Sequence, residues 1–230
     1  MNGETFVKIC GITNEADALT AIGLGADAIG LVFAPSPRQV SISTAKDIVR
    51  RLPHDAWSVG VFRDESPLRV VDIANEVGFK VVQLHGHETP EAVSFIAQRV
   101  NMVIKAISIN TITEAQINAF EADLLLVDGP NPGSGEMYDW SQAVNYIDPN
   151  RMILSGGLSP DNVGMLVSTL RPFGVDVSTG VEMAPGIKDP RKVMAFVNAV
   201  REAESLRPQR GHELNQDSDP DDEPYDWSRP

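Results

Sequence analysis

Eight apolar segments of strand length, each followed by a segment with helical spacing, constrain the fold of this chain more than any other feature. The strand-like segments are residues 5–10, 27–33, 57–62, 80–84, 102–108, 123–128, 151–155 and 175–178. The helical segments are residues 14–25, 43–52, 67–78, 89–100, 113–120, 139–147, 159–170 and 189–204. Continuously apolar strands are typical of a parallel sheet covered on both faces. Eight such units in about 200 residues predict an α/β protein with a single closed (β/α)8 TIM barrel.

A doubly wound open sheet is the structural alternative. Such sheets usually have fewer strands, and those that bind dinucleotides carry a G-x-G-x-x-G motif between the first strand and its helix. No such motif follows residues 5–10. The barrel is therefore the preferred prediction.

The composition of the chain restricts the cellular compartment and the classes of binding partner that we expect. The chain of 230 residues has one cysteine, which excludes an internal disulfide framework. It shows no apolar run of about 20 residues and no basic-then-apolar start, as a membrane span or a signal peptide would require. We therefore expect a soluble cytoplasmic protein. The net charge of −13 disfavours nucleic acids and anionic membranes as partners.

The end of the chain differs from the rest in composition. Residues 211–230 hold seven acidic residues against one arginine, with few aliphatic side chains. This composition favours disorder over a second folded unit. We predict a catalytic barrel domain over residues 1–205 and an acidic, disordered tail over residues 206–230.

In a barrel of this kind the carboxyl ends of the strands carry the chemistry. The candidates at those ends are Cys10, the loop of residues 34–41, Gln83 and His85, Asp128, the pair Gly156 and Gly157, and the segment Ser178 to Gly180. Cys10 ends the first strand segment in the stretch KICGIT. A free cysteine commonly behaves as a small core hydrophobe, so a packing role is the alternative to a chemical one.

Two glycine-containing loops, SGGLSPDN and VSTGVE, follow the last two strand segments. Barrels commonly bind phosphate there, because glycine lets backbone N–H groups approach a ligand closely. The alternative is that these glycines only turn the chain. Ser159 as cap and Pro160 at the first helical position predict a helix that begins directly after the glycine pair. The predicted phosphate-binding residues are Gly156, Gly157, Ser178, Thr179 and Gly180.

Six ordered motifs resemble phosphoribosylanthranilate isomerase of tryptophan biosynthesis: KICGIT, GADAIGLVFAPSPRQVS, VQLHG, LLLVDG followed by GSGEMYDW, LSGGLSPDNV and GVDVSTGVE. The resemblance implies a TIM barrel that carries out an Amadori rearrangement of N-(5-phosphoribosyl)anthranilate without a cofactor. It implies a small phosphorylated substrate and leaves monomer and homodimer open. Thr179 stands where the family commonly has serine, a change that keeps the hydroxyl.

The resemblance also implies roles for individual residues. Cys10 resembles the general base of the family and Asp128 its general acid. Arg38 resembles the contact to the anthranilate moiety, and Asp176 resembles a residue that supports substrate binding near the site. The histidine of VQLHG, His85, is expected to be packed or hydrogen-bonded rather than catalytic.

The reaction needs both an acid and a base beside one sugar, because the ring oxygen must gain a proton and C2 must lose one. An unperturbed thiol is mostly protonated at neutral pH, while an unperturbed aspartic acid is mostly ionised. Cys10 therefore needs positive groups nearby. Lys8 lies two residues earlier, so its side chain should share the direction of Cys10. We expect a thiol pKa below the ordinary value.

Further features are interpreted more simply. The stretch 129–140 is rich in glycine and proline, which predicts either a loop that closes over the substrate or a long irregular connection. His54, His87 and His212 show no metal-ligand spacing with the one cysteine, so no metal site is predicted.

Two other functions stay open from the sequence. The histidine-pathway isomerase of a similar phosphoribosyl substrate uses the same chemistry, but it carries aspartate where Cys10 stands, so the cysteine favours anthranilate. A non-catalytic phosphate-binding barrel whose tail recruits a partner is the second alternative, since a fold alone does not prove activity. The joint presence of Cys10, Asp128 and Arg38 favours the enzyme.

Overall fold

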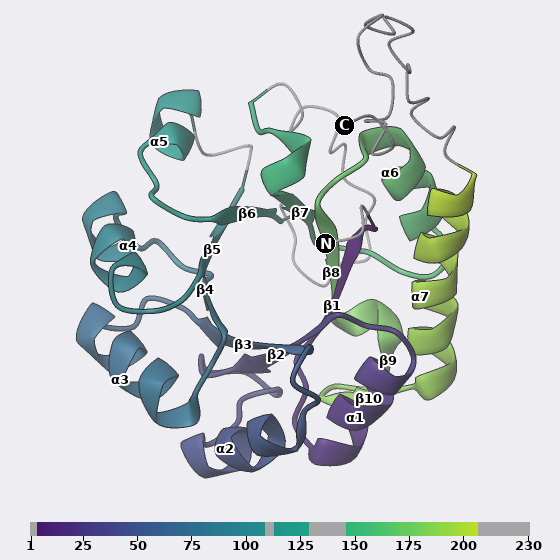
Figure 1. Ribbon diagram of the computed structural model, residues 1–230, viewed down its shortest axis with the longest axis horizontal. Helices are drawn as coiled ribbons and strands as arrows, with labels where there is room; N and C mark the ends of the chain where they lie inside the picture. Colours follow the sequence, from purple (N-terminus) through teal and green to yellow (C-terminus); the bar gives the residue numbers. More distant parts are fainter. Residues whose placement is uncertain (1–3, 109–112, 129–145, 207–230) are drawn as a thin grey trace, which may run out of the picture.

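Eight parallel strands form a closed barrel in which β1 pairs with both β2 and β8 (Figure 1). The computed structural model describes residues 4–108, 113–128 and 146–206. The strands are β1 (Phe6–Cys10), β2 (Ala28–Val32), β3 (Trp57–Phe62), β4 (Val81–Leu84), β5 (Val103–Ile107), β6 (Leu124–Val127), β7 (Met152–Leu154) and β8 (Gly174–Val177). All eight fall within the segments predicted for them, apart from Gly174 at the start of β8. The predicted TIM barrel is confirmed.

Helices surround the barrel as an outer ring (Figure 1). They are α1 (Glu15–Gly23), α2 (Ile42–Arg51), α3 (Pro67–Val77), α4 (Pro90–Ala97), α5 (Glu114–Asn118), α6 (Val163–Leu170) and α7 (Pro190–Ser205). Side-chain oxygens of the residue preceding each helix cap the first five, as at Asn14, Ser41 and Thr89. The predicted helix over 139–147 lies largely outside the described residues, as does the tail from residue 207.

Inside the barrel the side chains change from apolar to polar along the strands. Phe6, Val59, Val81, Ile104 and Leu126 belong to the buried apolar cluster of the interior. Since side chains two residues apart on a strand share a face, Lys8 and Cys10 follow Phe6, and Gln83 follows Val81. The polar members of this series lie nearer the carboxyl ends. The barrel therefore has an apolar base and a polar mouth.

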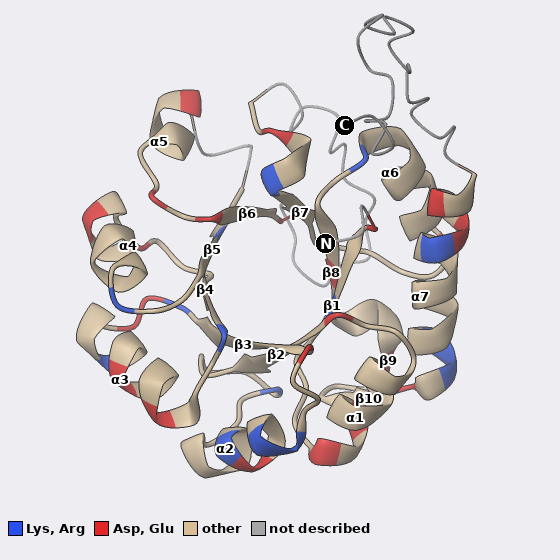
Figure 2. Cartoon of the chain, viewed as in Figure 1, with Lys and Arg blue, Asp and Glu red and all other residues tan. Residues whose placement is uncertain are grey.

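The outer layer of the core lies between the strands and the helices. It includes Ile9, Ile29 and Val82 from the strands, with Val93 and Phe196 from α4 and α7, all of them buried. Alternate residues of each strand thus face two different apolar layers, which explains the continuously apolar strand sequences. Figure 2 shows the charged residues mainly on the helices and loops of the outer ring.

One predicted boundary is wrong. Helix α6 begins at Val163, with Asn162 as its cap, and not directly after the glycine pair. The Asn162 side chain accepts a hydrogen bond from the Ser159 N–H at 2.8 Å and donates to the Gly157 carbonyl at 2.9 Å. These local bonds hold residues 159–162 in a turn in place of a first helical turn.

A short hairpin follows β8 and was not predicted. It consists of β9 (Glu182–Ala184) and β10 (Ile187–Lys188), and a single 3-10 turn, η3 (Thr179–Val181), leads into it. Strands of three and two residues are too short to show a periodic pattern. Another 3-10 turn, η2 (Pro149–Arg151), precedes β7. Over the described residues, no helix is both long and apolar enough to cross a membrane.

Candidate active site

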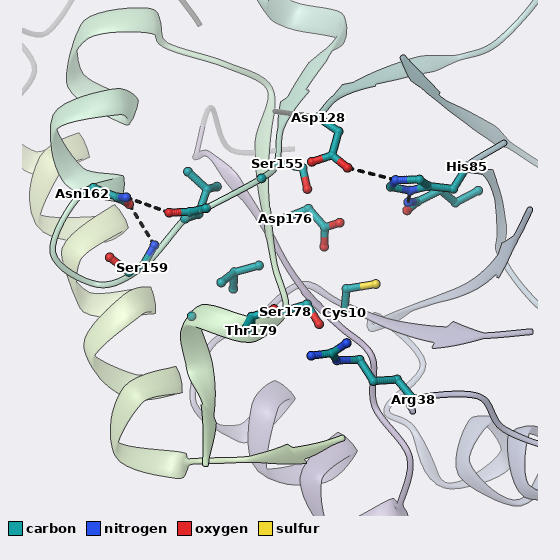
Figure 3. A pocket seen from close by; sticks show the side chains of 16 residues that line it. Cys10, Arg38, His85, Asp128, Ser155, Ser159, Asn162, Asp176, Ser178 and Thr179 are labelled. Atoms are coloured by element: carbon teal, nitrogen blue, oxygen red, sulfur yellow. Dashed lines mark hydrogen bonds and ion pairs between the residues drawn. The ribbon is translucent and has the colours of Figure 1, made fainter. Parts of the chain in front are cut away.

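A cavity of about 430 Å³ opens at the carboxyl ends of the strands (Figure 3). All nine residues predicted for the site line it: Cys10, Arg38, Asp128, Gly156, Gly157, Asp176, Ser178, Thr179 and Gly180. They come from loops and strands that are distant in the sequence, and the barrel brings them together. Figure 3 shows Cys10, Asp128 and Arg38 reaching into one space from different sides.

Cys10 lies at the end of β1 beside a buried ion pair. Lys8 is fully buried, and its Nζ donates to Oδ1 of Asp176 at 2.8 Å. Burial opposes the charge of Lys8, but Asp176 and Cys10 outweigh it and raise the lysine pKa. Lys8 therefore remains a cation next to the thiol. The direction predicted for its side chain is the one observed.

Gly30 of β2 provides the space that Cys10 and Lys8 occupy. A Cβ atom at this position would lie 2.8 Å from Sγ of Cys10 and 3.1 Å from Nζ of Lys8. Both distances are too short for an ordinary contact, so any side chain here would displace the thiol, the ammonium group or both. The absence of a side chain at Gly30 lets the sulfur and the ammonium group converge.

The thiol itself does not have the lowered pKa that the sequence predicted. Burial raises the pKa of Cys10, Asp176 adds to that effect, and Lys8 and Lys188 oppose it without reversing it. The reason is that desolvation disfavours a thiolate more strongly than two neighbouring lysines favour it.

A second buried ionic cluster holds Arg38. Its Nε and Nη2 donate to the two carboxylate oxygens of Glu182 at 2.7 and 2.6 Å. Lys188 Nζ donates to the same carboxylate at 2.9 Å. Although burial favours the neutral carboxyl, hydrogen bonds from Arg38 and Lys188 hold the pKa of Glu182 down to about 2. The unpredicted hairpin, which carries Glu182 and Lys188, thus anchors the guanidinium group.

Asp128 directly follows β6 and lies at the other side of the cavity. Its Oδ2 is 3.1 Å from Nε2 of His85, and Nδ1 of His85 is 2.9 Å from Nε2 of Gln83. Asp128 is 8% exposed and Gln83 is fully buried. The expectation that His85 is hydrogen-bonded therefore holds, and its partner is the predicted acid.

The two glycine loops, after β7 and β8, pack against each other at one end of the cavity. Gly156 and Gly157 have φ values of 84° and 67°, a region that favours glycine. A Cβ on Gly180 would lie only 2.0 Å from the Leu158 carbonyl oxygen. The second loop therefore packs directly on the backbone of the first, which keeps both sets of backbone groups at one end of the cavity.

A family model described as N-(5'phosphoribosyl)anthranilate (PRA) isomerase matches residues 7–199. The chain belongs to this family. The N-(5'-phosphoribosyl)anthranilate isomerase of Desulforudis audaxviator is 42% identical over 206 residues, 86% of this chain and 99% of that relative. The resemblance drawn from the six motifs is confirmed.

Solved structures of the family agree with the barrel. The phosphoribosyl anthranilate isomerase of Thermus thermophilus has a TM-score of 0.80 and 39% identity, and the match covers 88% of this chain and 100% of that one. A family structure in complex with reduced 1-(o-carboxyphenylamino)-1-deoxyribulose 5-phosphate has a TM-score of 0.75 and 40% identity, with the same coverage of both chains.

For this family member, sequence reasoning missed three residues that shape the site. Glu182 ends the quoted motif GVDVSTGVE but received no role, and Lys188 gave no signal, because their hairpin is too short to show a periodic pattern. Gln83 was a candidate by position but received no role. Within the described ranges, no group of three or more His, Cys, Asp or Glu side chains could hold a metal ion. The segment 129–140, for which the sequence left open a loop that closes over the substrate or a long irregular connection, lies outside the described residues.

Proposed function

We propose that this protein isomerises N-(5'-phosphoribosyl)anthranilate to 1-(2-carboxyphenylamino)-1-deoxyribulose 5-phosphate by general acid–base catalysis. The observation that carries the proposal is the placement of Cys10 and Asp128 in one cavity, with Arg38 and two glycine loops around them. The complex of a family structure with the reduced product supports the choice of ligand. The reaction belongs to tryptophan biosynthesis.

The phosphate group binds at the loops after β7 and β8 in this proposal. Backbone N–H groups near Gly157 and Gly180 supply donors, and the hydroxyls of Ser178 and Thr179 line the same part of the cavity. Because both loops are packed on each other, they form one anion-binding surface. Binding there fixes the sugar between the acid and the base.

Asp128 is the acid of the first step. Its carboxyl proton goes to the furanose ring oxygen while the C1–O bond breaks, and the nitrogen lone pair forms the C1=N bond of an open-chain iminium ion. Asp128 is left as a carboxylate. Nε2 of His85 lies 3.1 Å from Oδ2 of Asp128, and in its protonated form it donates a hydrogen bond that stabilises that charge.

Cys10 is the base of the second step. Its thiolate takes the proton from C2, the electrons of the C–H bond form the C1=C2 bond, and the C1=N pair returns to nitrogen. The resulting enolamine then tautomerises to the ketone. One proton has passed from Asp128 to the substrate and another from the substrate to Cys10, and exchange with water resets both groups. Lys8 and Lys188 stabilise the thiolate before it reacts.

Arg38 binds the anthranilate carboxylate in this scheme. Two of its N–H groups are engaged by Glu182, and the guanidinium group carries five in total. Glu182 therefore holds the planar group in one orientation and leaves further donors for the substrate. Asp176 supports the site by keeping Lys8 in place. We further propose that the protein works in the cytoplasm as a monomer or homodimer.

The test is a steady-state assay of the purified protein with two substrates, N-(5'-phosphoribosyl)anthranilate and the phosphoribosyl substrate of the histidine-pathway isomerase. Turnover of the first alone is the expected result. Comparable efficiency on both would mean a bifunctional enzyme. Binding of a phosphorylated analogue without turnover of either substrate would favour a non-catalytic barrel.

A further inference from the structure

Gln83 combines three properties that point to a role in the site. It is fully buried, it lines the cavity, and its Nε2 hydrogen-bonds with Nδ1 of His85 at 2.9 Å. Its carbonyl oxygen Oε1 is the one buried side-chain nitrogen or oxygen atom without a hydrogen-bond partner among the described residues. An unsatisfied buried acceptor costs free energy, so its presence beside a ligand cavity calls for a functional reason.

The orientation of the Gln83 amide determines which ring nitrogen of His85 carries the proton. An amide nitrogen is a donor only, so Nδ1 of His85 must accept from Gln83 and carries no proton. The neutral imidazole then has its proton on Nε2, which faces Oδ2 of Asp128 at 3.1 Å. Gln83 thus determines that His85 presents a donor to Asp128.

The opposite orientation of the amide would change this outcome. With Oε1 toward His85, Nδ1 would carry the proton, and the neutral ring would offer Asp128 an acceptor in place of a donor. The donor is needed when Asp128 has given up its proton and becomes negative. The orientation of one buried amide therefore controls how well the charge left on the acid is stabilised.

We propose that Gln83 is a positioning residue for Asp128, acting through His85, and that its Oε1 accepts a hydrogen bond from a hydroxyl group of the bound sugar. The proposal rests on the proposed function for the identity of the sugar. A ribosyl substrate brings hydroxyl donors into the cavity that Gln83 lines. One such bond satisfies Oε1 and locks the amide in the orientation that presents the His85 donor to Asp128.

The first test is the tautomer of His85 in the free protein, measured by 15N NMR of histidine-labelled samples. The His85 signals are assigned as those lost in His85→Asn. A neutral ring protonated at Nε2 is the expected result, and a ring protonated at Nδ1 would overturn the proposal. In Gln83→Glu, whose ionised carboxylate only accepts hydrogen bonds, both ring nitrogens should carry protons. An unchanged His85 spectrum in a folded Gln83→Glu variant would also overturn it.

The second test measures, by steady-state kinetics, the contribution of the His85 donor to Asp128 separately from that of the Gln83 acceptor. His85→Gln keeps an N–H donor near Asp128 while His85→Ala removes it, so His85→Ala should lose about tenfold to a hundredfold in kcat and His85→Gln should recover much of that. His87→Gln is the matched control, since His87 lies two residues further along with an 89% exposed side chain. Equal kcat in His85→Ala and wild type would remove the positioning role.

The third test addresses the acceptor. Gln83→Met keeps the length of the side chain but has no carbonyl oxygen, so it should weaken binding of the reduced product by about tenfold, whereas His85→Gln should leave that binding within about twofold. Unchanged binding in Gln83→Met would exclude the hydroxyl contact. Binding and tautomer measurements need no turnover, so they remain decisive even if the wild-type protein fails to isomerise the proposed substrate.

Discussion

The two sides of the cavity are built from different chemistry. Around Cys10 lie five charged groups in close ion pairs: Lys8, Arg38, Asp176, Glu182 and Lys188. Around Asp128 lie a neutral amide and an imidazole ring, Gln83 and His85. One side is an ionic cluster and the other is a hydrogen-bonded chain.

The difference follows from when each side carries negative charge. Cys10 must be negative before it reacts, and the three cations and two carboxylates of its described neighbours leave one positive charge in excess. Asp128 must be neutral before it reacts and becomes negative only afterwards. A fixed cation there would keep it ionised, whereas an N–H donor stabilises the product charge without that penalty. The four predictions that follow test this contrast.

The largest effect is expected from removing either reacting group. Cys10→Ala and Asp128→Asn should each lower kcat by at least about a hundredfold, within the usual 10²–10⁴ contribution of a positioned acid or base. Thermal melts of both variants check that they fold. Turnover close to wild type in either folded variant would remove that residue from the mechanism.

The second-largest effect is the loss of unfolding free energy expected when Glu182 is replaced by the neutral glutamine. Glu182→Gln leaves Lys188, which is 3% exposed, without its carboxylate, and breaking such a buried pair costs roughly 3 kcal/mol of unfolding free energy. Because the pKa of Glu182 is lowered to about 2, the stabilisation is complete above its ordinary value of 4.5 and is lost as the pH falls toward 2.

Urea denaturation at several pH values measures this effect. Glu76→Gln is the control, since it removes a surface ion pair with Lys46 in which both side chains are about half exposed, and such a pair contributes at most about 1 kcal/mol. A difference between wild type and Glu182→Gln that persists unchanged at pH 2 would contradict the assigned ion pairs.

A smaller effect is expected at Gly30. Gly30→Ala places a methyl group where the Cys10 sulfur and the Lys8 ammonium group converge, so kcat should fall about tenfold or more while KM changes little. Gly23→Ala is the control, because a Cβ there meets nothing within 4 Å. Full activity in Gly30→Ala would show that the thiol does not need its present position.

The smallest effect concerns the titration of Cys10 in the free protein. Iodoacetamide should alkylate the thiol at a rate that follows its thiolate fraction, with a pKa above the ordinary value of 9.0 because burial outweighs the lysines. The denatured protein is the reference. A Cys10 pKa lower in the native than in the denatured protein would mean that the lysines outweigh burial. The electrostatic difference between the Cys10 side and the Asp128 side of the cavity would then be larger than described.

The sequence predicted the barrel and its mouth well because both depend on local patterns. Continuously apolar strands, helical spacing and glycine-rich ends recur at regular intervals, and the parallel topology then places every strand end on one face. The strand alternation also predicted that Lys8 and Cys10 share a direction. The start of α6 could not be predicted, because Ser159 and Pro160 resemble a helix start while the Asn162 side chain closes a turn.

By itself, the sequence determined the fold, the family, and nine of the residues that line the cavity. Only the tertiary structure decided which groups contact one another: Glu182 with Arg38 and Lys188, Asp176 with Lys8, and Gln83 with His85 and Asp128. It also decided the direction in which the Cys10 pKa moves. The physical reason is that the spacing of apolar residues within each segment predicts its secondary structure and its buried face. Hydrogen bonds and desolvation instead depend on distances between segments far apart in the chain.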